Sequence, residues 1–491
     1  MGENLSKTVA QGRAFMNIIG GEQIEAKSGE RMDVVAPSDG LAFGSIPASN
    51  EADVDAAVHS ARHAYEQGEW GRMAAVDRGR ILLKLSELIT GNAKELAALE
   101  SRDTGKPIKQ GIADIVGCAR YFEFYGGAAD KIHGDTIPIA GDFLALTLRE
   151  PHGVVAGIIP WNYPAQILGR VAGAGLAMGN SIVLKPAEDA CLSVIRIAEL
   201  ALEAGLPAGA FNVVCGTGKD AGAPLSAHPD VDFVTFTGSP LTGTAIQQAA
   251  AINNRGVTME LGGKSPQIIF ADADLDAALP LVVNAIIQNG GQTCSAGSRV
   301  LIEASIYDEF TKRLAEKFAK LVAGPHDADL DLGPLISKKQ HTLVQGFIDE
   351  AIASGTELLA QGSIAGNAPE GGYYCAPALF GNVEANSSIA QKEVFGPVLA
   401  AFSFIDEDEA LMLANNTEFG LVAAIWTRDG ARQMRMAKRV RAGQVFVNTY
   451  GAGGGIELPF GGFKKSGHGR EKGFDGLFHM SATKTVVFKH N

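Results

Sequence analysis

Short apolar runs of strand length, each followed by a turn and a helical pattern, most limit how this chain can fold. Four of these runs, rich in Val and Ile, occupy residues 154–159, 181–184, 211–214 and 231–237. A mostly apolar run is typical of a strand buried on both faces, as in a parallel sheet covered by helices on both sides. The pattern therefore predicts a doubly wound α/β domain.

The same alternation returns between about residues 267 and 450 and predicts a second α/β domain. Its strand candidates occupy residues 267–270, 299–302, 398–404, 421–426 and 444–448. Helical patterns lie among them at residues 273–288, 307–322 and 338–354. A length of 491 residues agrees with two or three domains, because one hydrophobic core rarely serves more than about 250–300 residues. A cleft between domains is then expected.

Two amphipathic helices are predicted before the first strand run. One covers residues 50–66 with Asn50 as its cap, and the other runs from about 76 to 103 and ends before Gly105. At the other end of the chain, an alternating run at 483–489 predicts a strand that could pair outside its own domain.

Charge and composition exclude several classes of partner. The chain has 55 acidic and 42 basic residues and a net charge of −13, so we expect neither nucleic acid nor an anionic membrane as partner. The start of the chain does not resemble a signal peptide. The longest uncharged span, 277–298, is interrupted by Pro280 and several amides, which predicts a buried helix and loop rather than a membrane span.

Cysteine and histidine usage predicts no metal site. The five cysteines are scattered without CxxC spacing, and the ten histidines show no HExxH or comparable motif. This usage favours a reducing, cytoplasmic setting.

Glycine is in excess at roughly 12% of the residues, against an average of about 7%. This excess predicts many tight turns or close backbone approaches.

Cys294 is the first candidate for chemistry. It follows the predicted buried helix on a glycine-flanked turn, where a thiol can reach a cleft and act as a nucleophile. The alternative is a buried, inert cysteine, which the local sequence alone favours.

Two polar residues at predicted turns are further candidates. Glu260 lies between apolar residues before a glycine pair, where desolvation would raise its pKa toward the range of a general base. A solvated or lysine-paired carboxylate is the alternative. Asn162 ends an apolar strand, and its amide could donate to an oxyanion, although a simple turn asparagine is the alternative.

Phosphate and ribose binding have weaker candidates. Residues 236–243 form a strand, a glycine turn and a helix start, which is an arrangement that binds anions, but the spacing is neither GxGxxG nor a P-loop. Lys185, with Glu188 three residues later, suits ribose hydroxyls at the end of a strand, although a surface ion pair is equally compatible.

Seven segments together resemble the aldehyde dehydrogenase superfamily in order and spacing across essentially the whole chain. They are Pro-Trp-Asn-Tyr-Pro from 160, Leu-Lys-Pro-Ala-Glu from 184, Phe-Thr-Gly-Ser from 236, Glu-Leu-Gly-Gly-Lys-Ser from 260, Gly-Gln-Thr-Cys from 291, Glu-Val-Phe-Gly-Pro from 393 and Pro-Phe-Gly-Gly-Phe-Lys-Lys-Ser-Gly from 459. The resemblance implies an NAD(P)-dependent, hydrolytic aldehyde dehydrogenase.

This resemblance implies a role for each catalytic candidate. Cys294 would attack the aldehyde, and the Asn162 amide and the backbone N–H of Cys294 would stabilise the oxyanion. After hydride transfer, Glu260 would activate the water that hydrolyses the thioester. Because members that pass the acyl group to coenzyme A differ at this position, we expect the free acid as product.

The resemblance also implies the cofactor site. Lys185 and Glu188 would hold the adenosine ribose, Gly238 and Ser239 would approach the pyrophosphate, and Glu393 would bind the nicotinamide ribose. The remaining residues implied for the cofactor are Pro160, Trp161 and Phe395. A carboxylate at Glu188 repels a 2′-phosphate, so we expect NAD, with NADP tolerated at best.

The domain division implied by the family has three parts. Residues 1–128 and 152–262 would form the NAD-binding domain, and 263–470 the catalytic domain. Residues 129–151 and 471–491 would form a small β oligomerisation element that builds a homodimer or homotetramer and covers the exposed tail strand.

The aldehyde itself is less determined. The implied tunnel residues are Tyr163, Ile167, Arg170, Tyr450, Glu457 and Phe460. The glycine-rich residues 451–455, with Gly117 and Ala165, suggest a roomy mouth for a bulky aromatic or long aldehyde, unless these glycines only shape a loop. Glu457 would favour an amino or betaine aldehyde, whereas Arg170 would favour a semialdehyde. These two predictions conflict.

Two other classes of function stay open at this point. One is an acyl-transferring or ester-hydrolysing enzyme that uses the same thiol. The other is a non-catalytic structural or binding protein on the same fold. The presence of Cys294, Glu260, Asn162 and Glu393 argues against a protein that has lost its activity.

Overall fold

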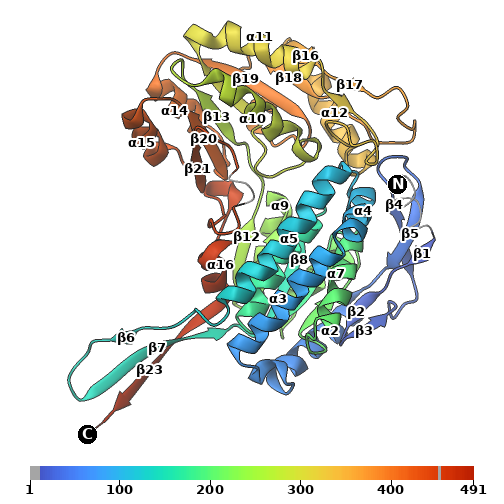
Figure 1. Cartoon of the computed structure of the whole chain (residues 1–491), viewed down its shortest axis with the longest axis vertical. Helices are drawn as coiled ribbons and strands as arrows, with labels where there is room; N and C mark the ends of the chain where they lie inside the picture. The colour runs from blue at the N-terminus through green and yellow to red at the C-terminus, as the bar shows by residue number, and fades with distance from the viewer. Residues whose placement is uncertain (1–11, 452–454, 491) are drawn as a thin grey trace.

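The computed structural model describes residues 12–451 and 455–490 (Figure 1). The larger of its two main sheets has eight strands in the order β22-β12-β11-β8-β9-β10-β2-β3. Their bounds are β2 Asn17–Ile19, β3 Glu22–Ile24, β8 Val154–Ile159, β9 Ser181–Pro186, β10 Phe211–Val213, β11 Phe233–Thr237, β12 Gly256–Glu260 and β22 Gly467–His468. The five central strands, β12 to β10, are parallel. Because β8 lies between β9 and β11, the chain order reverses there, which confirms the doubly wound prediction.

Both faces of this sheet are covered, which explains why its strands are apolar throughout. Along β8, Val155 and Ile159 pack into one core and Val154, Ala156 and Ile158 into another. The first core contains α3 Ala75–Gly91, α4 Ala93–Thr104, α5 Ile108–Ala128, α6 Pro164–Ala177 and α7 Leu192–Glu203. The second contains α2 Glu51–Glu66, α8 Ala223–Ala227 and α9 Pro240–Ile252.

Of the two helices predicted near the N-terminus, the first is confirmed and the second is wrong. Helix α2 is capped by Asn50, whose side chain accepts a hydrogen bond from Ala52 N at 3.0 Å. The single helix predicted over 76–103 is wrong, because Asn92 breaks it into α3 and α4. The Asn92 side chain donates to Leu88 O at 2.8 Å and ends α3. Helix α4 ends at Gly105, which has the left-handed φ of 81°.

The second sheet has seven strands in the order β16-β18-β19-β14-β13-β20-β21. They are β13 Pro266–Ile269, β14 Arg299–Glu303, β16 Glu357–Gln361, β18 Ala378–Gly381, β19 Val398–Phe404, β20 Val422–Trp426 and β21 Gln444–Val447. All are parallel except β16. Its helices are α10 Leu275–Ile287, α11 Tyr307–Phe318, α12 Lys338–Ala353, α14 Glu407–Asn415 and α15 Gly430–Arg439. The second α/β alternation is therefore confirmed, although β16 and β18 were not predicted.

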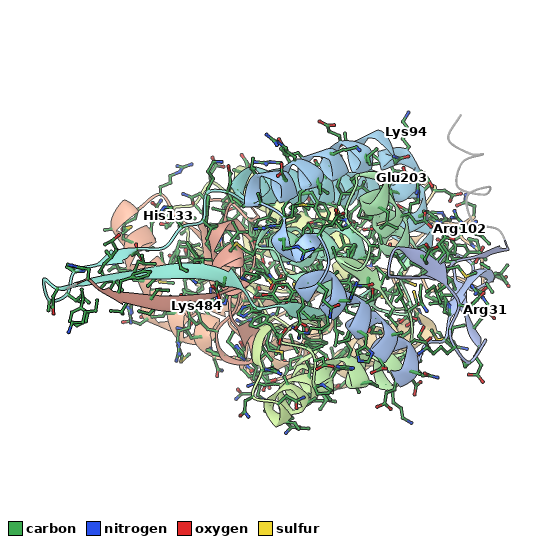
Figure 2. All side chains as sticks on the ribbon, turned by 90° about the horizontal axis from the view of Figure 1, so that it is seen from below. Arg31, Lys94, Arg102, His133, Glu203 and Lys484 are labelled. Atoms are coloured by element: carbon green, nitrogen blue, oxygen red, sulfur yellow. The ribbon has the colours of Figure 1, made fainter. Side chains whose placement is uncertain are left out.

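A third sheet projects from the body of the molecule (Figure 1). It pairs β23 Ser481–Lys489 with β7 Phe143–Pro151, and β7 with the short β6 Thr136–Ile137. In Figure 2, His133 and Lys484 lie on this projecting part, and Lys484 forms an ion pair with Glu150 on the neighbouring strand. The predicted tail strand thus exists and begins two residues earlier than expected.

Smaller elements complete the fold. A three-stranded sheet contains β1 Arg13–Ala14, β4 Arg31–Val35 and β5 Ala42–Pro47, and the remaining elements are β15 Val322–Ala323, β17 Ser363–Ile364, α13 Ser388–Gln391 and α16 Gly473–His479. Among the residues given above as described, no helix is long and apolar enough to cross a membrane. All five cysteines are free.

Candidate active site

Two cavities meet at Cys294. The first, of about 310 Å³, lies at the carboxyl ends of the adjacent strands β8, β11 and β12, and we call it the strand-end cavity. It is lined by Pro160, Trp161, Asn162, Thr237, Gly238, Ser239, Glu260, Leu261, Gly262, Cys294, Gln340, Leu343, Glu393 and Phe395. The second, of about 330 Å³, is the tunnel cavity, and it also reaches Asn162 and Cys294. These two residues are shared by both linings.

The strand-end cavity lies where the topology of the sheet predicts a ligand. Strands β8 and β11 are neighbours on the two sides of the chain reversal, and ligands bind at such a point in open α/β sheets. The parallel register places Thr237 opposite Glu260, so the residues after both strands meet at one edge.

A strained loop presents Cys294 to both cavities. After α10 the backbone takes left-handed φ values at Asn289 (52°), Gly290 (63°) and Gly291 (75°). A Cβ at Gly291 would lie 2.1 Å from Gly396 O, and one at Gly263 would lie 2.2 Å from Cys294 O. Glycine is therefore required at both positions for the backbone to pass this closely.

The thiol of Cys294 is held in its protonated form. Its pKa is raised to about 12: burial is the largest cause, the nearby carboxyls of Glu393 and Glu260 add to the rise, and Arg170 opposes it. A reaction through the thiolate therefore needs a group that takes the proton.

Asn162 is fixed beside this loop by its own amide. Its side-chain nitrogen donates to Gln292 O at 2.9 Å, which leaves a second N–H on the same nitrogen. Its backbone carbonyl accepts from Lys106 Nζ at 3.0 Å and from Asn289 Nδ2 at 2.9 Å. An asparagine held in this way is a rigid donor next to the nucleophile, as an oxyanion site requires.

Glu260 ends β12 with a fully buried carboxyl group. Neither of its oxygens has a hydrogen-bond partner in the described part of the chain, and Oε1 lies against Gly461. Burial raises its pKa well above the ordinary value, Glu471 adds to the rise, and Arg170, Arg470 and Lys472 oppose it. A buried carboxyl without partners is costly for folding, so its position indicates a functional group.

Glu393 and the aromatic residues close the other side of the strand-end cavity. Glu393 Oε1 accepts from Gly263 N at 2.8 Å. Burial raises the pKa of Glu393 to about 7, against the effects of the Gly263 N–H and of Lys264. The rings of Trp161 and Phe395 meet edge to face with centroids 5.3 Å apart.

The features of this cavity fit a dinucleotide. Helix α9 starts at its edge, and Ser239 caps the helix by accepting from Thr242 N, so the helix N-terminus offers an anion site. Thr237 Oγ1 is buried without a partner among the described residues. Lys185 and Glu188 pair at 3.1 Å and do not line the cavity, but Lys185 lies opposite Ile158 of β8, at the next strand end.

The tunnel cavity contains five of the six predicted tunnel residues: Tyr163, Ile167, Arg170, Tyr450 and Phe460. Glu457 is the exception, and its placement in the tunnel is wrong. Its carboxylate binds Arg120 at 2.7 Å and is 55% exposed. Gly451 and Gly455 line the cavity, whereas residues 452–454 lie outside the described residues. Gly117 packs against Gln166 instead, and Ala165 is fully buried.

Two cationic side chains face the tunnel cavity. The guanidinium of Arg170 lies over the Phe460 ring at 5.0 Å, donates to the Tyr121 hydroxyl at 3.2 Å and approaches Glu471 at 3.8 Å. Lys472 Nζ also lies over the Phe460 ring, 5.2 Å from its centroid, and burial lowers the pKa of Lys472 to about 7.

Several site residues were not predicted. Gln340 and Leu343 on α12 line the strand-end cavity, and no pattern in the sequence distinguishes them from other helix residues. Glu471 and Lys472 did have a signal, because they form a charged run inside a glycine-rich tail. No group of three or more His, Cys, Asp or Glu side chains that could hold a metal occurs in the described ranges.

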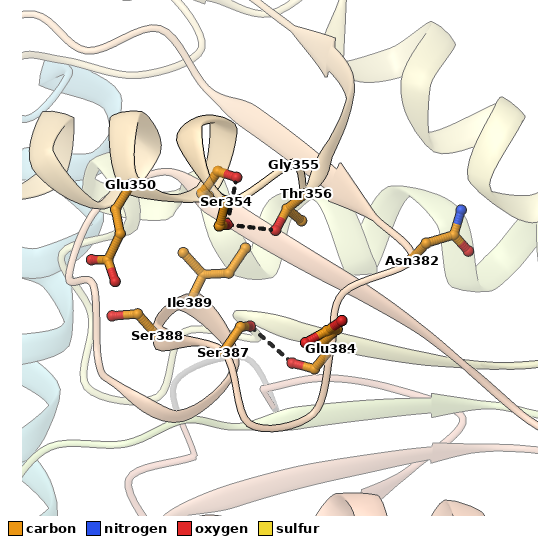
Figure 3. A pocket seen from close by; sticks show the side chains of 10 residues that line it. Glu350, Ser354, Gly355, Thr356, Asn382, Glu384, Ser387, Ser388 and Ile389 are labelled. Atoms are coloured by element: carbon orange, nitrogen blue, oxygen red, sulfur yellow. Dashed lines mark hydrogen bonds between the residues drawn. The ribbon is translucent and has the colours of Figure 1, made fainter.

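A third cavity, of about 320 Å³, lies away from this site, at the end of α12 (Figure 3). Two of its hydroxyl groups bind the protein itself: Ser354 donates to Ala351 O at 2.8 Å and Ser387 donates to Glu384 O at 2.8 Å, whereas Ser388 Oγ has no partner among the described residues. None of the predicted site residues lines it.

Comparisons with known proteins agree over nearly the whole chain. The sequence model of the aldehyde dehydrogenase family matches residues 24–486. Human retinal dehydrogenase 2 is 42% identical over 475 residues, which cover 96% of this chain and 91% of that protein. A solved candidate aldehyde dehydrogenase from Burkholderia cenocepacia is 58% identical, with a TM-score of 0.96 over 97% of this chain and 100% of that chain. The NAD-dependent aldehyde dehydrogenase of Sinorhizobium meliloti is 40% identical, with a TM-score of 0.95 over 98% of this chain and 96% of that chain.

Proposed function

This chain belongs to the aldehyde dehydrogenase family, and on that premise we propose that it oxidises an aldehyde to the free carboxylic acid with NAD as hydride acceptor. The observation that carries the proposal is the position of Cys294 and Asn162, which line both cavities. One cavity can then hold the cofactor and the other the aldehyde, with the nucleophile and the oxyanion donor between them.

The chemistry of the first half follows from these two residues. The Cys294 thiol gives its proton to the ionised Glu260 carboxylate, which releases it to solvent, and the sulfur adds to the aldehyde carbon as the carbonyl electron pair moves onto oxygen. The free N–H of the Asn162 amide and the backbone N–H of Cys294 stabilise this oxyanion, as preorganised donors do in a water-excluded site. When bound, NAD accepts the hydride that leaves the thiohemiacetal carbon. Cys294 then carries a thioester.

Glu260 completes the second half. Its carboxylate takes a proton from water, the resulting hydroxide adds to the thioester carbon, and the thiolate of Cys294 leaves as the acid forms. A raised pKa makes the Glu260 carboxylate a strong base once it is ionised. Arg170, Arg470 and Lys472 favour that ionised form.

The cofactor preference rests on Glu188 and Lys185. An ionised Glu188 accepts hydrogen bonds from ribose hydroxyls and repels a 2′-phosphate. We expect kcat/KM to be at least about tenfold higher with NAD than with NADP, because like charges in contact cost several kcal/mol. Equal efficiency with both cofactors in steady-state assays would contradict this assignment.

For the substrate, the tunnel cavity favours an aldehyde that carries a carboxylate. Arg170 and Lys472 face this cavity, whereas Glu457, the acidic residue that would attract a cationic aldehyde, is turned outward and paired with Arg120. Phe446, Tyr450 and Phe460 add apolar, aromatic side chains to the lining of the same cavity. A semialdehyde or a carboxylated aromatic aldehyde fits this lining better than an amino or betaine aldehyde.

The domain roles and the assembly are part of the same proposal. We assign residues 1–128 and 152–262 to NAD binding and 263–470 to catalysis. The first main sheet and the cavity at its strand ends support this division, although β22 returns from the second part to the first sheet. Residues 129–151 and 471–491 would join copies of the chain into a homodimer or homotetramer.

The main claim is tested with Cys294→Ala. This variant should form no NADH from any aldehyde, whereas Cys375→Ala, a matched change at a thiol outside both cavities, should keep activity. Persisting NADH formation in Cys294→Ala would exclude the mechanism. Omitting NAD separates the other classes, because an esterase or acyl transferase would continue without it, and a non-catalytic protein would show no turnover at all.

The substrate class is tested with matched aldehydes. Succinic semialdehyde, butanal and 4-aminobutanal differ mainly in terminal charge, and the carboxylated member should have the highest kcat/KM. Arg170→Met should lower that value about 10- to 100-fold relative to butanal, as expected for the loss of a charged hydrogen bond. Arg120→Met, which releases Glu457 and Glu123 at the surface, is the control. Preference for 4-aminobutanal in the unmodified enzyme would reverse the assignment.

A further inference from the structure

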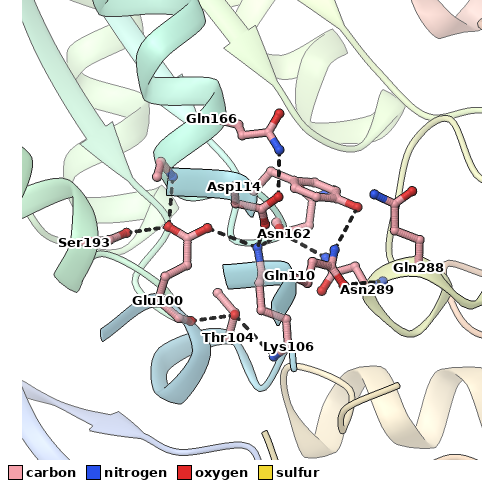
Figure 4. Close-up of polar contacts among 12 residues, drawn as sticks. Glu100, Thr104, Lys106, Gln110, Asp114, Asn162, Gln166, Ser193, Gln288 and Asn289 are labelled. Atoms are coloured by element: carbon pink, nitrogen blue, oxygen red, sulfur yellow. Dashed lines mark hydrogen bonds and ion pairs between the residues drawn. The ribbon is translucent and has the colours of Figure 1, made fainter. Parts of the chain in front are cut away.

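A buried ion cluster lies behind the oxyanion site, at the corner where α4 meets α5 (Figure 4). Lys106 Nζ contacts Glu100 Oε1 at 3.1 Å, Asp114 Oδ2 at 2.6 Å and Asn162 O at 3.0 Å. All three charged side chains are fully buried. Burying three charges is expensive, and replacement of such clusters by apolar residues is often neutral for stability. A contribution to stability is therefore a weak explanation for the cluster.

Each member of this cluster binds the segment 162–166, which carries the oxyanion donor. Lys106 binds the carbonyl of Asn162, and Glu100 Oε2 accepts from Ala165 N at 3.2 Å. Asp114 Oδ1 accepts from Gln166 Nε2 at 2.7 Å. Three charges thus hold three residues of one short segment.

The same corner also holds the loop of the nucleophile. Gln110 lies in the first turn of α5, four residues after Lys106. It accepts from Asn289 N at 3.0 Å and donates to the Tyr163 hydroxyl at 3.4 Å. Asn289 shares the acceptor of Lys106, because its side chain donates to Asn162 O at 2.9 Å. Asn289 has a left-handed backbone, which persists only where its surroundings hold it in place.

We propose that Lys106 is a positioning residue for the oxyanion step, and that with Glu100 and Asp114 it sets the Asn162 amide relative to Cys294. The proposal rests on the proposed function, because it concerns the same step. Lys106 lines neither cavity, so it acts through Asn162 and not on the aldehyde or the cofactor. A displacement of about 1 Å at such a donor can cost about 100-fold in rate.

The test is a double-mutant cycle of Lys106→Met and Asn162→Ala. Lys106→Met alone should lower kcat about 10- to 100-fold and change the Kd for NAD by less than about twofold, since Lys106 itself does not line the cofactor cavity. In the Asn162→Ala background, Lys106→Met should lower kcat by less than about twofold, because the group through which it acts is gone. Lys109→Met, three residues away and bound only to a surface loop, should behave as the unmodified enzyme.

Equal losses in both backgrounds, or an unchanged kcat in Lys106→Met, would overturn the proposal. If Lys106→Met does not fold, the double-mutant cycle is measured with Gln110→Met and Asn162→Ala instead. Gln110 acts on the Asn162 carbonyl through Asn289, so the two losses in kcat should again be non-additive. Absence of NADH formation in the unmodified protein would instead refute the proposed function. The positioning claim would then be decided by a crystal structure of Lys106→Met, in which an unmoved Asn162 amide excludes it.

Discussion

Three acidic groups of the site, Glu260, Cys294 and Glu393, line the strand-end cavity. Burial is the largest cause of the raised pKa of each one. Each group needs its ionised form for a different purpose. The Glu260 carboxyl must be ionised to act as a base, and the Cys294 thiol must be ionised to act as a nucleophile. The Glu393 carboxyl must be ionised to accept a strong, charge-assisted hydrogen bond from a hydroxyl. The site is therefore expected to respond to pH through more than one group.

Glu393 gives a direct prediction, because its pKa of about 7 lies within the physiological range. Below this value the carboxyl group is protonated and would lose the charge-assisted hydrogen bonds to ribose that we propose for it. If only the ionised form binds well, the Kd for NAD should rise about tenfold as pH falls from 8 to 6. Titration calorimetry measures this change, and Glu393→Gln should remove it. A Kd that is equal at both pH values would contradict the role of Glu393.

Gly262 makes a second prediction at this scale. A Cβ at this position would lie 2.2 Å from Glu393 Oε2, so the carboxylate must move while the backbone can remain. Gly262→Ala should leave the unfolding midpoint nearly unchanged and weaken NAD binding about tenfold or more. The control is Gly346→Ala in α12, where an added Cβ meets nothing within 4 Å and should raise stability by up to about 1 kcal/mol. A Gly262→Ala variant that binds NAD normally would contradict this reading of the turn.

At the scale of elements, α4 is tied to its neighbours by buried polar groups as well as by packing. Asp103 on α4 accepts from Leu192 N, at the start of α7, at 2.9 Å. Its second oxygen has no partner among the described residues, and burial raises its pKa from 3.8 to about 8. The free energy of unfolding therefore depends on the protonation of Asp103.

The sign of this effect sets a prediction for Asp103→Asn. Between about pH 4 and 8 the folded protein holds a proton on Asp103 that the unfolded chain releases, so stability falls as pH rises through this window. Asparagine keeps the acceptor and does not titrate. Between pH 6 and 8 the unmodified protein should lose about 1–3 kcal/mol more unfolding free energy than Asp103→Asn in urea titrations. The same change of unfolding free energy with pH in both proteins would contradict this prediction. The control is Asp77→Asn, a substitution at an exposed aspartate.

The break between α3 and α4 shows how local signals are missed. Gly91 and Asn92 are residues that often end helices, yet the apolar pattern continues across them and predicts one helix. The structure bends the chain at Asn92, because two shorter helices can each pack against α5. Strands β16 and β18 were missed for the opposite reason: their short sequences carry little pattern of their own.

At the scale of the whole molecule, the projecting sheet of β6, β7 and β23 leaves an unusual apolar surface. Leu144 and Phe488 lie opposite each other in the β7–β23 register, and both are about half exposed. The outer edge of β23 is unpaired within the described part of the chain. An exposed strand edge with apolar side chains is a surface that natural proteins cover.

This surface predicts the effect of charging it. In the double variant Leu144→Lys, Phe488→Lys, the homodimer or homotetramer proposed above should dissociate toward monomers, because the lysines added to each copy would repel one another across the proposed interface. Light scattering after gel filtration measures the mass. Leu41→Lys, at an exposed apolar residue away from this sheet, should keep the mass of the unmodified protein. An unchanged mass in the double variant would place the interface elsewhere.

At the scale of the whole molecule, the chain also returns at β22 from the second sheet to the first. After the second sheet is complete, residues 467–468 pair with β12 of the first sheet. This crossing brings Gly461, Arg470 and Glu471 beside Glu260, about 200 positions earlier in the chain. The electrostatic environment of the proposed base is therefore set by a segment that no local pattern connects to it.

The sequence by itself determined the α/β class, most strands of the central sheets and the segments that carry Cys294, Glu260, Asn162 and Glu393. These features follow from short-range physics, since apolar runs, glycine turns and strand ends are properties of neighbouring residues. Only the tertiary structure decided that Glu457 faces solvent and Arg170 faces the tunnel cavity, and that Lys106 lies behind Asn162. Those outcomes depend on contacts between residues dozens to hundreds of positions apart, where burial and pairing are set by the packed fold.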